Sequence, residues 1–473
     1  MDSENSDVPL LTSRIRDLNL TKPVILDARI SIREAAAKMR ARRLDALLVR
    51  DETRHGVLTS ADIRDALALS ELPVETPIGS IATWKLVMVS PDELLFKALL
   101  LMTKRAVNRV VVGTAGHVSG ILGLSELLSF LTNHASLTIQ RILRAASLAE
   151  LTNATSHQPH LVDSLISKGV KARHISRLVR ELNRQVFEKA AKLLAPPDLL
   201  DHISIVVMGS EGRGEQIIKS DQDNGLIADE NCSGEACQAF AHAFSMALTQ
   251  LGYPLCPGNV MMTNPQWSGR ISDYETLIRS WVREPSHTNL MQLAIFFDAR
   301  TVAGQSGPWR SVRDALFEQL PNDPSFYAHF ARPMLSFETP LGIFNRFIVE
   351  KGEKQGQIDL KKGGVFPIVH GVRSLALEHR LKDPNTIHRI RGLVRRGVLE
   401  TSLGTDLIDA FDFLSGLRVR VKREARLRHG GEGDYLLVDD LGRLEKEYLR
   451  DSLGVVDGFK ELITHHFRLR QFH

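Results

Sequence analysis

Two aspartates spaced one residue apart, Asp221 and Asp223, are the residues of this chain best suited to chemistry. If their segment is extended, side chains at positions i and i+2 point to the same side, so we expect the two carboxylates to converge. A carboxylate pair without His or Cys ligands is the kind of site that binds Mg²⁺ or Mn²⁺ together with substrate phosphates. The spacing therefore predicts a Mg²⁺ (or Mn²⁺) site of the sort that assists nucleotide transfer.

A glycine-rich turn precedes the aspartates and follows the apolar run 203–208. Gly209, Gly212 and Gly214 permit the positive φ angles and the close backbone approach that a phosphate-binding turn needs. Ser210 adds a hydroxyl donor, and Arg213 offers a fork of donors to a phosphate. A solvated turn without a ligand is the alternative for such a stretch. We expect the turn to bind the phosphates of a nucleotide.

The segment resembles the signature of the DNA polymerase β-type nucleotidyltransferase superfamily, in which an apolar strand, Gly-Ser and Asp-x-Asp follow in this order. Its Gly-Ser-x-Gly-Arg-x-Glu and Ser-Asp-x-Asp motifs are similar to those of the PII uridylyltransferase and the glutamine synthetase adenylyltransferase. The form Ser220-Asp221-Gln222-Asp223-Asn224 resembles a nucleotidyltransferase family that carries CBS domains in front. The superfamily usually has apolar residues at the positions of Gln222 and Asn224, so this chain departs from the general pattern.

This resemblance implies an enzyme that moves a nucleoside monophosphate from an NTP substrate to an acceptor hydroxyl, with pyrophosphate leaving. Asp221 and Asp223 would be catalytic and would hold the metal, and Ser220 joins the nucleotide-binding residues. The resemblance also implies a regulatory protein as the acceptor. The alternative is a catalytically inactive, nucleotide-responsive signalling protein that docks a partner. Retention of both aspartates favours the enzyme.

Two later segments supply further candidates. Asp298 follows the apolar run 293–297 and is the candidate for a third catalytic, metal-binding carboxylate, since two-metal sites usually recruit one from a neighbouring strand. A salt bridge to Arg300 or a charge at a helix end is its alternative role. A later Asp-x-Lys-Lys-Gly-Gly segment resembles one that follows the core in adenylyl- and uridylyltransferases, which implies that Lys361 and Lys362 contact the nucleotide. An exposed loop is the alternative there.

An internal repeat organises the first 130 residues. Val24-Ile-Leu and Leu47-Leu-Val49 recur as Val87-Met-Val and Val110-Val-Val112, an offset of 63 residues. Each copy has the order strand, helix, strand, strand, helix. This order resembles a tandem pair of CBS domains, which implies clefts for an adenine nucleotide.

The CBS resemblance also implies particular ligand contacts. In the family, the Thr and Asp of a closing Gly-x-x-Thr-x-x-Asp motif contact the ribose of the nucleotide, and Thr59 and Asp62 match them. The second copy has Gly123 and Glu126 at these positions, so we expect at most one competent cleft. Capping of the following helix is the alternative role for Thr59 and Asp62.

Length and hydrophobic spacing predict a multidomain α/β plus all-α protein. At 473 residues the chain is too long for one core. We expect a tandem CBS pair at residues 14–134 and a helical connector at 135–197. A polymerase β-type nucleotidyltransferase mixed sheet should follow at 198–320, and a helical C-terminal domain at 321–473.

Composition adds milder expectations. The formal net charge is only +4, so no nucleic acid partner is expected. Three cysteines match no disulfide framework or zinc motif, which favours structural thiols in a cytoplasmic protein. No stretch approaches the roughly 18 apolar residues of a membrane span, so no membrane partner is expected. CBS pairs often associate, which adds the expectation of a homodimer.

Overall fold

The computed structural model describes fourteen stretches of the chain, which carry all the structural statements that follow. They are residues 14–18, 20, 23–42, 44–52, 54–105, 107–114, 117–124, 126–127, 141–156, 158–167, 170–342, 346–350, 354–429 and 433–471. The chain divides into two compact units, Met1–Leu137 and Thr138–His473. The domain boundaries expected at residues 134, 197 and 320 stay predictions.

The first unit contains the same strand pairing twice. Each copy has a three-stranded sheet, of order β1-β2-β3 or β4-β5-β6, in which the first pair is parallel and the second antiparallel. The elements are β1 (Ile25–Asp27), α2 (Ile32–Ala41), β2 (Ala46–Asp51), β3 (Arg54–Thr59), α3 (Ser60–Ala68), β4 (Met88–Val89), α4 (Leu95–Lys104), β5 (Arg109–Thr114) and β6 (His117–Gly123), with short 3₁₀ helices at Ile15–Asp17 and Ile78–Ser80. The matching topology confirms the internal repeat.

The second unit is built around a four-stranded mixed sheet of order β10-β7-β8-β9. Strand β7 is antiparallel to β8 and β10, whereas β8 and β9 are parallel. The strands are β7 (Ile203–Val207), β8 (Asn224–Ala228), β9 (Ser268–Arg270) and β10 (Arg300–Gly304). The mixed sheet predicted from the sequence is thus confirmed.

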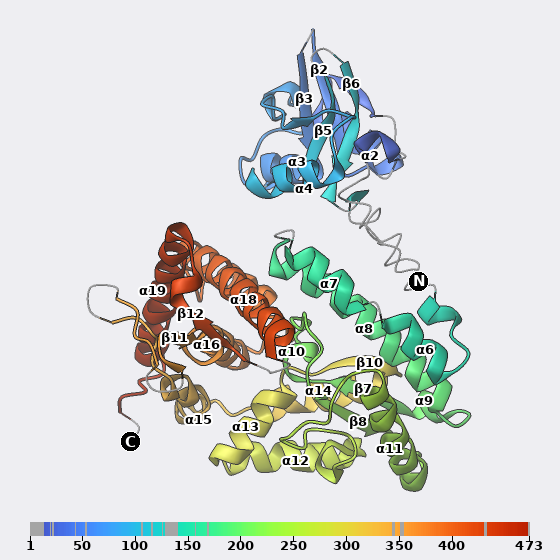
Figure 1. Ribbon diagram of the computed structural model, residues 1–473, viewed down its shortest axis with the longest axis vertical. Coiled ribbons are helices and arrows are strands. Elements are labelled where there is room, and N and C mark those ends of the chain that lie inside the picture. Colours follow the sequence, from blue (N-terminus) through green and yellow to red (C-terminus); the bar gives the residue numbers. More distant parts are fainter. Residues whose placement is uncertain are drawn as a thin grey trace. The chain divides into compact units, whose positions relative to one another are not determined.

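Helices cover both faces of this sheet (Figure 1). Val206 and Ile227 belong to one hydrophobic core, with residues of the helices on one face, while Ile205 and Leu226 belong to a second core with the helices of the other face. The helices of the first core are α12 (Ile271–Arg283), α13 (His287–Phe296) and α14 (Gly307–Gln319); those of the second are α6 (Leu148–Thr155), α8 (Ala172–Leu194), α9 (Leu199–His202) and α11 (Gly234–Gln250). Burial on both faces explains why β7 is apolar at nearly every position.

The C-terminal region is helical, as expected. Its helices are α15 (Pro324–Ala331), α16 (Phe366–Glu378), α17 (Thr386–Arg395), α18 (Thr401–His429) and α19 (Arg443–His466), with a π-helical turn η7 (Lys361–Val365) and the strand pair β11 (Gln357–Asp359) and β12 (Tyr435–Leu437). Helix α7 (Gln158–Ser167) comes earlier in the chain and packs on α8 and α18. The short segments are the turn α10 (Gly209–Gly212) and 3₁₀ helices at Pro265–Trp267, Arg332–Ser336 and Val438–Asp440.

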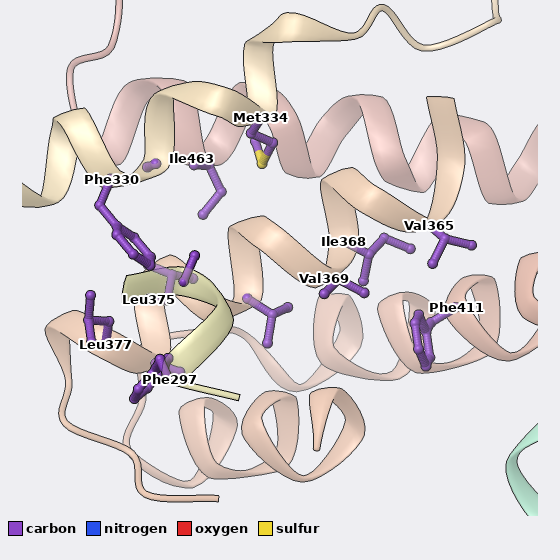
Figure 2. Packing of buried hydrophobic residues seen from close by; sticks show 14 of the residues in the cluster. Phe297, Phe330, Met334, Val365, Ile368, Val369, Leu375, Leu377, Phe411 and Ile463 are labelled. Carbon is purple, nitrogen blue, oxygen red and sulfur yellow. The ribbon is translucent and has the colours of Figure 1, made fainter. Parts of the chain in front are cut away.

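One continuous core joins the C-terminal helices to the sheet. Figure 2 shows Phe330 of α15, Leu375 of α16 and Ile463 of α19 in the same cluster as Phe297, which follows α13. Residues of the sheet, including Val206, belong to this cluster too. One hydrophobic cluster therefore connects the C-terminal helices to the sheet that carries the aspartate motif.

Local signals explain where several helices begin. Ser31 and Ser233 accept a hydrogen bond from the third helical residue of α2 and α11. Thr59 and Asp62 form a complete capping box at the start of α3. Within the described part of the chain, no helix has both the length and the apolar character needed to cross a bilayer.

Candidate nucleotide and metal site

The glycine turn and the aspartate motif meet at one end of the β7–β8 pair. Val207, the last residue of β7, lies opposite Asn224, the first residue of β8. Because the two strands are antiparallel, Met208, which follows Val207, lies opposite Asp223, which precedes Asn224, and the Met208 N–H donates to the Asp223 carbonyl at 2.8 Å. The short turn α10 begins with Gly209, so the turn lies directly beside Asp223.

The side chains around Gln222 alternate in direction. The Gln222 amide is buried and donates to the backbone carbonyls of Ser245 and Tyr253, both at 3.0 Å. Asp221 and Asp223 lie on the opposite side, where ligand atoms of both carboxylates and the Cys256 sulfur all fall within 4.8 Å of one another. The expected convergence of the two carboxylates is therefore present in the structure.

The two polar residues that depart from the superfamily pattern have structural partners. Gln222 ties the motif to α11, as described above, and Asn224 accepts a hydrogen bond from the Met262 N–H at 2.9 Å. The Asn224 amide also donates to the Gln222 side chain at 3.4 Å. These hydrogen bonds hold the aspartate motif against α11 and the 256–262 loop. The apolar residues usual at these two positions in the superfamily could do so only by packing.

Gly209 leaves room for the carboxylate of Asp223. Its φ angle is +57°, in the left-handed region, and a Cβ at this position would collide with the Asp223 carboxylate. Burial, and next the neighbouring charge of Asp221, raise the pKa of Asp223 to about 6. A cation bound between the carboxylates would relieve this repulsion, so the pair suits a divalent metal.

Cys256 is a member of this cluster that sequence reasoning assigned only a structural role. Burial raises the pKa of its thiol, and so do the charge of Asp223 and a hydrogen bond to that carboxylate. In the absence of a metal the thiol therefore stays protonated at neutral pH and can donate a hydrogen bond to the Asp223 carboxylate. The two carboxylates supply hard oxygen donors, which suit Mg²⁺ or Mn²⁺.

The predicted nucleotide-binding residues fall into two groups. Ser210 is half-buried in the turn beside the carboxylates, and the positive charge of Lys361 from η7 acts against the rise in the pKa of Asp223, which places that lysine near the pair. Lys362 lies elsewhere: its ammonium is 4.0 Å from Asp359 and faces the Phe337 ring. The structure thus brings Lys361, but not Lys362, toward the aspartates.

Other residues of the motif have protein partners. The Ser220 hydroxyl accepts a hydrogen bond from the Gln216 amide at 2.7 Å. Gly212 lies so close to the backbone of Asp298 that a Cβ there would collide with the Asp298 carbonyl oxygen. Arg213 donates to Glu215 at 2.6 Å and to Asp298 at 2.7 Å, so its guanidinium is engaged with carboxylates.

Asp298 is fully buried and surrounded by arginines. Its oxygens accept hydrogen bonds from Arg213 at 2.7 Å, Arg373 at 2.5 Å and Arg389 at 2.7 Å. Burial acts to raise the pKa of Asp298, but the charges of Arg373, Arg389 and Arg213 hold it well below its usual range. Because these arginines occupy both oxygens, Asp298 joins the core to α16 and α17 and is not among the three residues whose ligand atoms converge around Asp221.

Among the described residues, Asp298 pairs with Arg213, Arg373 and Arg389, and not with Arg300, which was the partner in its alternative role. Arg300 donates to the Glu211 carboxylate at 2.7 Å. Burial raises the pKa of Glu211 to about 7, against the charge of Arg300. Arg373 and Arg389, the actual partners of Asp298, lie 75 and 91 residues further along the chain, and no local spacing in the sequence indicates the contact.

Asn183 of α8 is a further residue that sequence reasoning missed. Its amide donates to Glu211 at 2.9 Å and to Gln216 at 3.1 Å, and its oxygen accepts from Gln158 at 3.0 Å and Tyr253 at 2.7 Å. All four hydrogen-bonding positions of this buried amide are used. The network connects helices α7 and α8 to the glycine turn and to the loop before Asp221.

The first unit holds a separate cleft of about 410 Å³. Thr59 and Asp62 line it together with the basic side chains Lys85 and Arg109, whereas Glu126 is not part of its lining. The Thr59 hydroxyl and N–H both donate to the Asp62 carboxylate at 2.7 Å, so the two residues serve as a helix cap within the cleft. The capping role is thus present in the structure, and contact with a ligand in this cleft stays a prediction.

Two tandem CBS-type sheets, followed by a mixed sheet with a Gly-Ser turn and a convergent aspartate pair, define a CBS-linked protein with a nucleotidyltransferase-type core. Family models bear this out along the chain. The "CBS domain" model matches residues 15–69 and 78–133, "Putative nucleotidyltransferase DUF294" matches 156–288, and "Putative nucleotidyltransferase substrate binding domain" matches 324–467. The chain belongs to this CBS-linked nucleotidyltransferase family.

Several relatives and solved structures that contain CBS domains each cover about a quarter of this chain. The CBS domain-containing protein CBSCBSPB1 of Arabidopsis thaliana is 32% identical over 117 residues, which is 24% of this chain and 22% of that protein. A CBS domain protein of Pyrobaculum aerophilum, solved in complex with AMP, is 25% identical, with a TM-score of 0.23 and coverage of 25% of this chain and 98% of that one. An uncharacterised conserved protein of Pyrococcus horikoshii is also 25% identical, with a TM-score of 0.24 and coverage of 25% and 90%. The chain thus spans about a fifth of the length of the curated relative.

Proposed function

We propose that the protein is a Mg²⁺-dependent nucleotidyltransferase that moves a nucleoside monophosphate from an NTP to a hydroxyl of an acceptor, and that this acceptor is a regulatory protein. One observation carries the proposal: Asp221 and Asp223 converge beside the positive-φ turn at Gly209. Membership of a nucleotidyltransferase family supports the reaction class. The acceptor rests on the resemblance to protein-modifying uridylyl- and adenylyltransferases.

Asp221 and Asp223 would hold the metal, Mg²⁺ or Mn²⁺, through their carboxylate oxygens. When bound, such an ion neutralises phosphate charge and steadies the leaving pyrophosphate. The protonated Cys256 thiol donates to Asp223 and so helps fix the orientation of that carboxylate. Asp298 has no metal role in this proposal, because three arginines bind its oxygens.

The chain's own groups would orient the donor nucleotide. The first N–H groups of the turn α10, at Gly209 and Ser210, have no partner inside that single turn and are available to phosphate oxygens. Lys361 adds a positive charge from the C-terminal region. In the reaction the acceptor oxygen bonds to the α-phosphorus, the bond from that phosphorus to the bridging oxygen breaks, pyrophosphate leaves, and the acceptor proton passes to solvent.

We further propose that an adenine nucleotide binds the CBS cleft and controls the transfer. Thr59 and Asp62, the residues of the family motif that would contact the ribose, line this cleft. Lys85 and Arg109 line it too and supply positive charge for phosphates.

A cytoplasmic location fits the free cysteines, including the Cys232 and Cys237 sulfurs, which lie 2.8 Å apart without a disulfide. The homodimer stays a prediction that sedimentation would check.

The test uses each labelled NTP with Mg²⁺ and the full chain in a cell lysate. Wild-type protein should label a protein band with at least one NTP, and Asp221→Asn combined with Asp223→Asn should lower the rate by at least about 10³-fold, because the phosphate charge is then unneutralised. Asp314→Asn, which changes an exposed carboxylate on α14, should label normally. Equal labelling by wild type and the double variant would rule out the proposed site.

A second candidate is a catalytically inactive protein that binds a nucleotide and docks a partner. Asp298 favours it, because the acid expected to be the third metal-binding carboxylate is enclosed by Arg213, Arg373 and Arg389. In that case Mn²⁺ and NTP would bind in equilibrium dialysis, and the double variant would lose this binding. No NTP would transfer label to any protein.

A further inference from the structure

A groove of about 770 Å³ lies between the start of α8 and the helix pair α18 and α19. These two helices pack side by side (Figure 1). The apolar part of the groove is formed by Ala172, Ile175, Ile217, Phe413, Leu417 and Val455. At its edge the Tyr448 side chain is 62% exposed, with its ring 5.9 Å from that of Phe413. An apolar groove edged by an exposed aromatic is typical of a surface that binds another chain.

The rim of the groove carries negative charge that the described part of the chain does not neutralise. Asp406 and Asp409 on α18 and Asp451 on α19 are exposed, and none of them forms an ion pair with another described residue. Lys171 on the opposite wall offsets one of these charges. The surplus is therefore acidic, and it favours a ligand with positive charge.

The other charged groups of the lining are already paired. The Asp412 carboxylate accepts from the Arg173 N–H at 3.0 Å and lies 3.7 Å from its guanidinium. Glu445 accepts from Arg420 at 2.6 Å. These pairs leave the three exposed aspartates and Lys171 as the charges that a ligand would meet, with the negative charges in excess.

One residue links the groove to the candidate transfer site. Ile217 lines the groove and belongs to the loop between the glycine turn and Asp221. Neither Asp221 nor Asp223 lines the groove, so the space is separate from the carboxylate pair. A chain bound in the groove would contact the same loop that carries the aspartates, while its reactive hydroxyl lies outside the groove.

We propose that this groove binds an amphipathic, lysine- or arginine-bearing helix of the protein acceptor, an inference that rests on the proposed function. The apolar wall would receive the hydrophobic face of that helix, and Asp406, Asp409 and Asp451 would pair with its basic side chains. The same aspartates repel a polyphosphate, a nucleic acid and an anionic lipid surface. The groove is thus a docking site for the acceptor and not a second nucleotide site.

The test measures fluorescence anisotropy of a labelled, designed amphipathic helix of about 16 residues with a lysine face, mixed with the full chain. The lysine peptide should bind, with affinity that falls as salt rises, and a charge-reversed glutamate peptide should not. Changing Asp406, Asp409 and Asp451 together to Lys should weaken binding at least about tenfold. Gly416→Leu should block it, because Gly416 lines the groove and its Cβ would point into open space.

Matched controls lie on α19 outside the groove. Gly454→Leu also adds a side chain in open space, and Asp457→Lys also reverses an exposed charge, so both should bind the lysine peptide normally. Equal binding by the groove variants, equal binding of the glutamate peptide, or no binding of either peptide would overturn the proposal. So would a sedimentation shift from dimer to monomer in Gly416→Leu, which would assign the groove to a second copy of the chain.

Peptide binding also separates this inference from the proposed reaction. The double variant of Asp221 and Asp223 should bind the lysine peptide normally while it loses label transfer. If wild-type protein transfers no label but the peptide data hold, the groove stands and the transfer proposal fails. If the groove variants lose the peptide yet label the acceptor at the wild-type rate, the groove does not serve the acceptor.

Discussion

Three aspartates near the glycine turn have different properties because their neighbours differ. Asp223 shares a partly buried space with Asp221, and burial and that neighbouring charge raise its pKa to about 6. Asp298 is buried more completely, yet the positive charges around it hold its pKa well below the usual range. The site of Asp221 and Asp223 needs a bound cation if both carboxylates are to be ionised, whereas arginine side chains already neutralise Asp298. Only the first is therefore suited to a metal.

At the same scale, Glu211 should make stability depend on pH. Burial raises its pKa to about 7 from 4.5, so between these pH values the folded protein holds a proton that the unfolded chain releases. Its stabilising contribution is full below pH 4.5 and is lost as pH rises through about 7, by on the order of 1–3 kcal/mol. Glu211→Gln should remove this part of the pH dependence.

Urea unfolding followed by tryptophan fluorescence at pH 5 and pH 8 measures the effect. Trp267, Trp281 and Trp309 all lie in the second unit and report on its unfolding. Glu235→Gln, at an exposed site on α11, should keep the wild-type pH dependence. An unchanged difference between the two pH values in Glu211→Gln would contradict the prediction.

At the level of secondary-structure elements, helix α8 positions the candidate site. Its Asn183 connects to the turn through Glu211, to the following loop through Gln216, and to α7 through Gln158. The aspartate loop is held on its other side by Gln222, which bonds to α11 and the residues after it. The loop between β7 and β8 is long and irregular, so these side-chain contacts replace the hydrogen bonds that regular structure would supply.

Replacing the Asn183 side chain should weaken both the fold and the candidate metal site. Asn183→Leu removes four hydrogen bonds and leaves buried polar partners unsatisfied, which should cost about 2–4 kcal/mol in the free energy of unfolding. Because the aspartate loop then loses one anchor, Mn²⁺ affinity measured by calorimetry under folding conditions should fall as well. Asn153→Leu, on the exposed side of α6, should change neither quantity by much. A loss of stability with unchanged Mn²⁺ affinity would limit Asn183 to a structural role.

On the scale of the whole molecule, the chain joins two units that have separate cores. The CBS repeat buries its own apolar residues around β2 and α2, and the second unit has two cores on the faces of its mixed sheet. Separate cores allow a ligand to stabilise one unit without changing the contacts of the other. A ligand of the first unit should therefore raise the melting temperature of that unit's own unfolding transition.

Calorimetry of the full chain should detect a ligand-dependent transition of the first unit. AMP, ADP or ATP should raise the Tm of the CBS transition by several degrees, since a ligand at about 100 times its Kd adds about 2.7 kcal/mol of stability. Asp62→Asn should abolish the shift, measured against the variant's own Tm because the helix cap is altered too. Asp65→Asn, an exposed neighbour on α3, should keep it. Absence of a shift with every adenine nucleotide would remove the sensing proposal.

Local features of the site were predictable from the sequence because they depend on neighbouring residues. The i, i+2 spacing of Asp221 and Asp223 predicted their convergence, and Gly209 marked a position with a positive φ angle. The fold class and the CBS repeat were predictable for a similar reason, since hydrophobic periodicity and an offset repeat are properties of short stretches. The class of protein was predictable because the Gly-Ser and Asp-x-Asp motif resembles that of a known family.

Only the tertiary structure decided which distant side chains meet. Asp298 binds Arg373 and Arg389, Arg300 binds Glu211, and Cys256 faces Asp223, none of which follows from spacing along the chain. Such contacts depend on how α16 and α17 pack on the sheet and on which loop covers which strand end. The physical reason is that helix and strand patterns specify which face is buried, while the partner of a buried charge is set by the elements that happen to cover it.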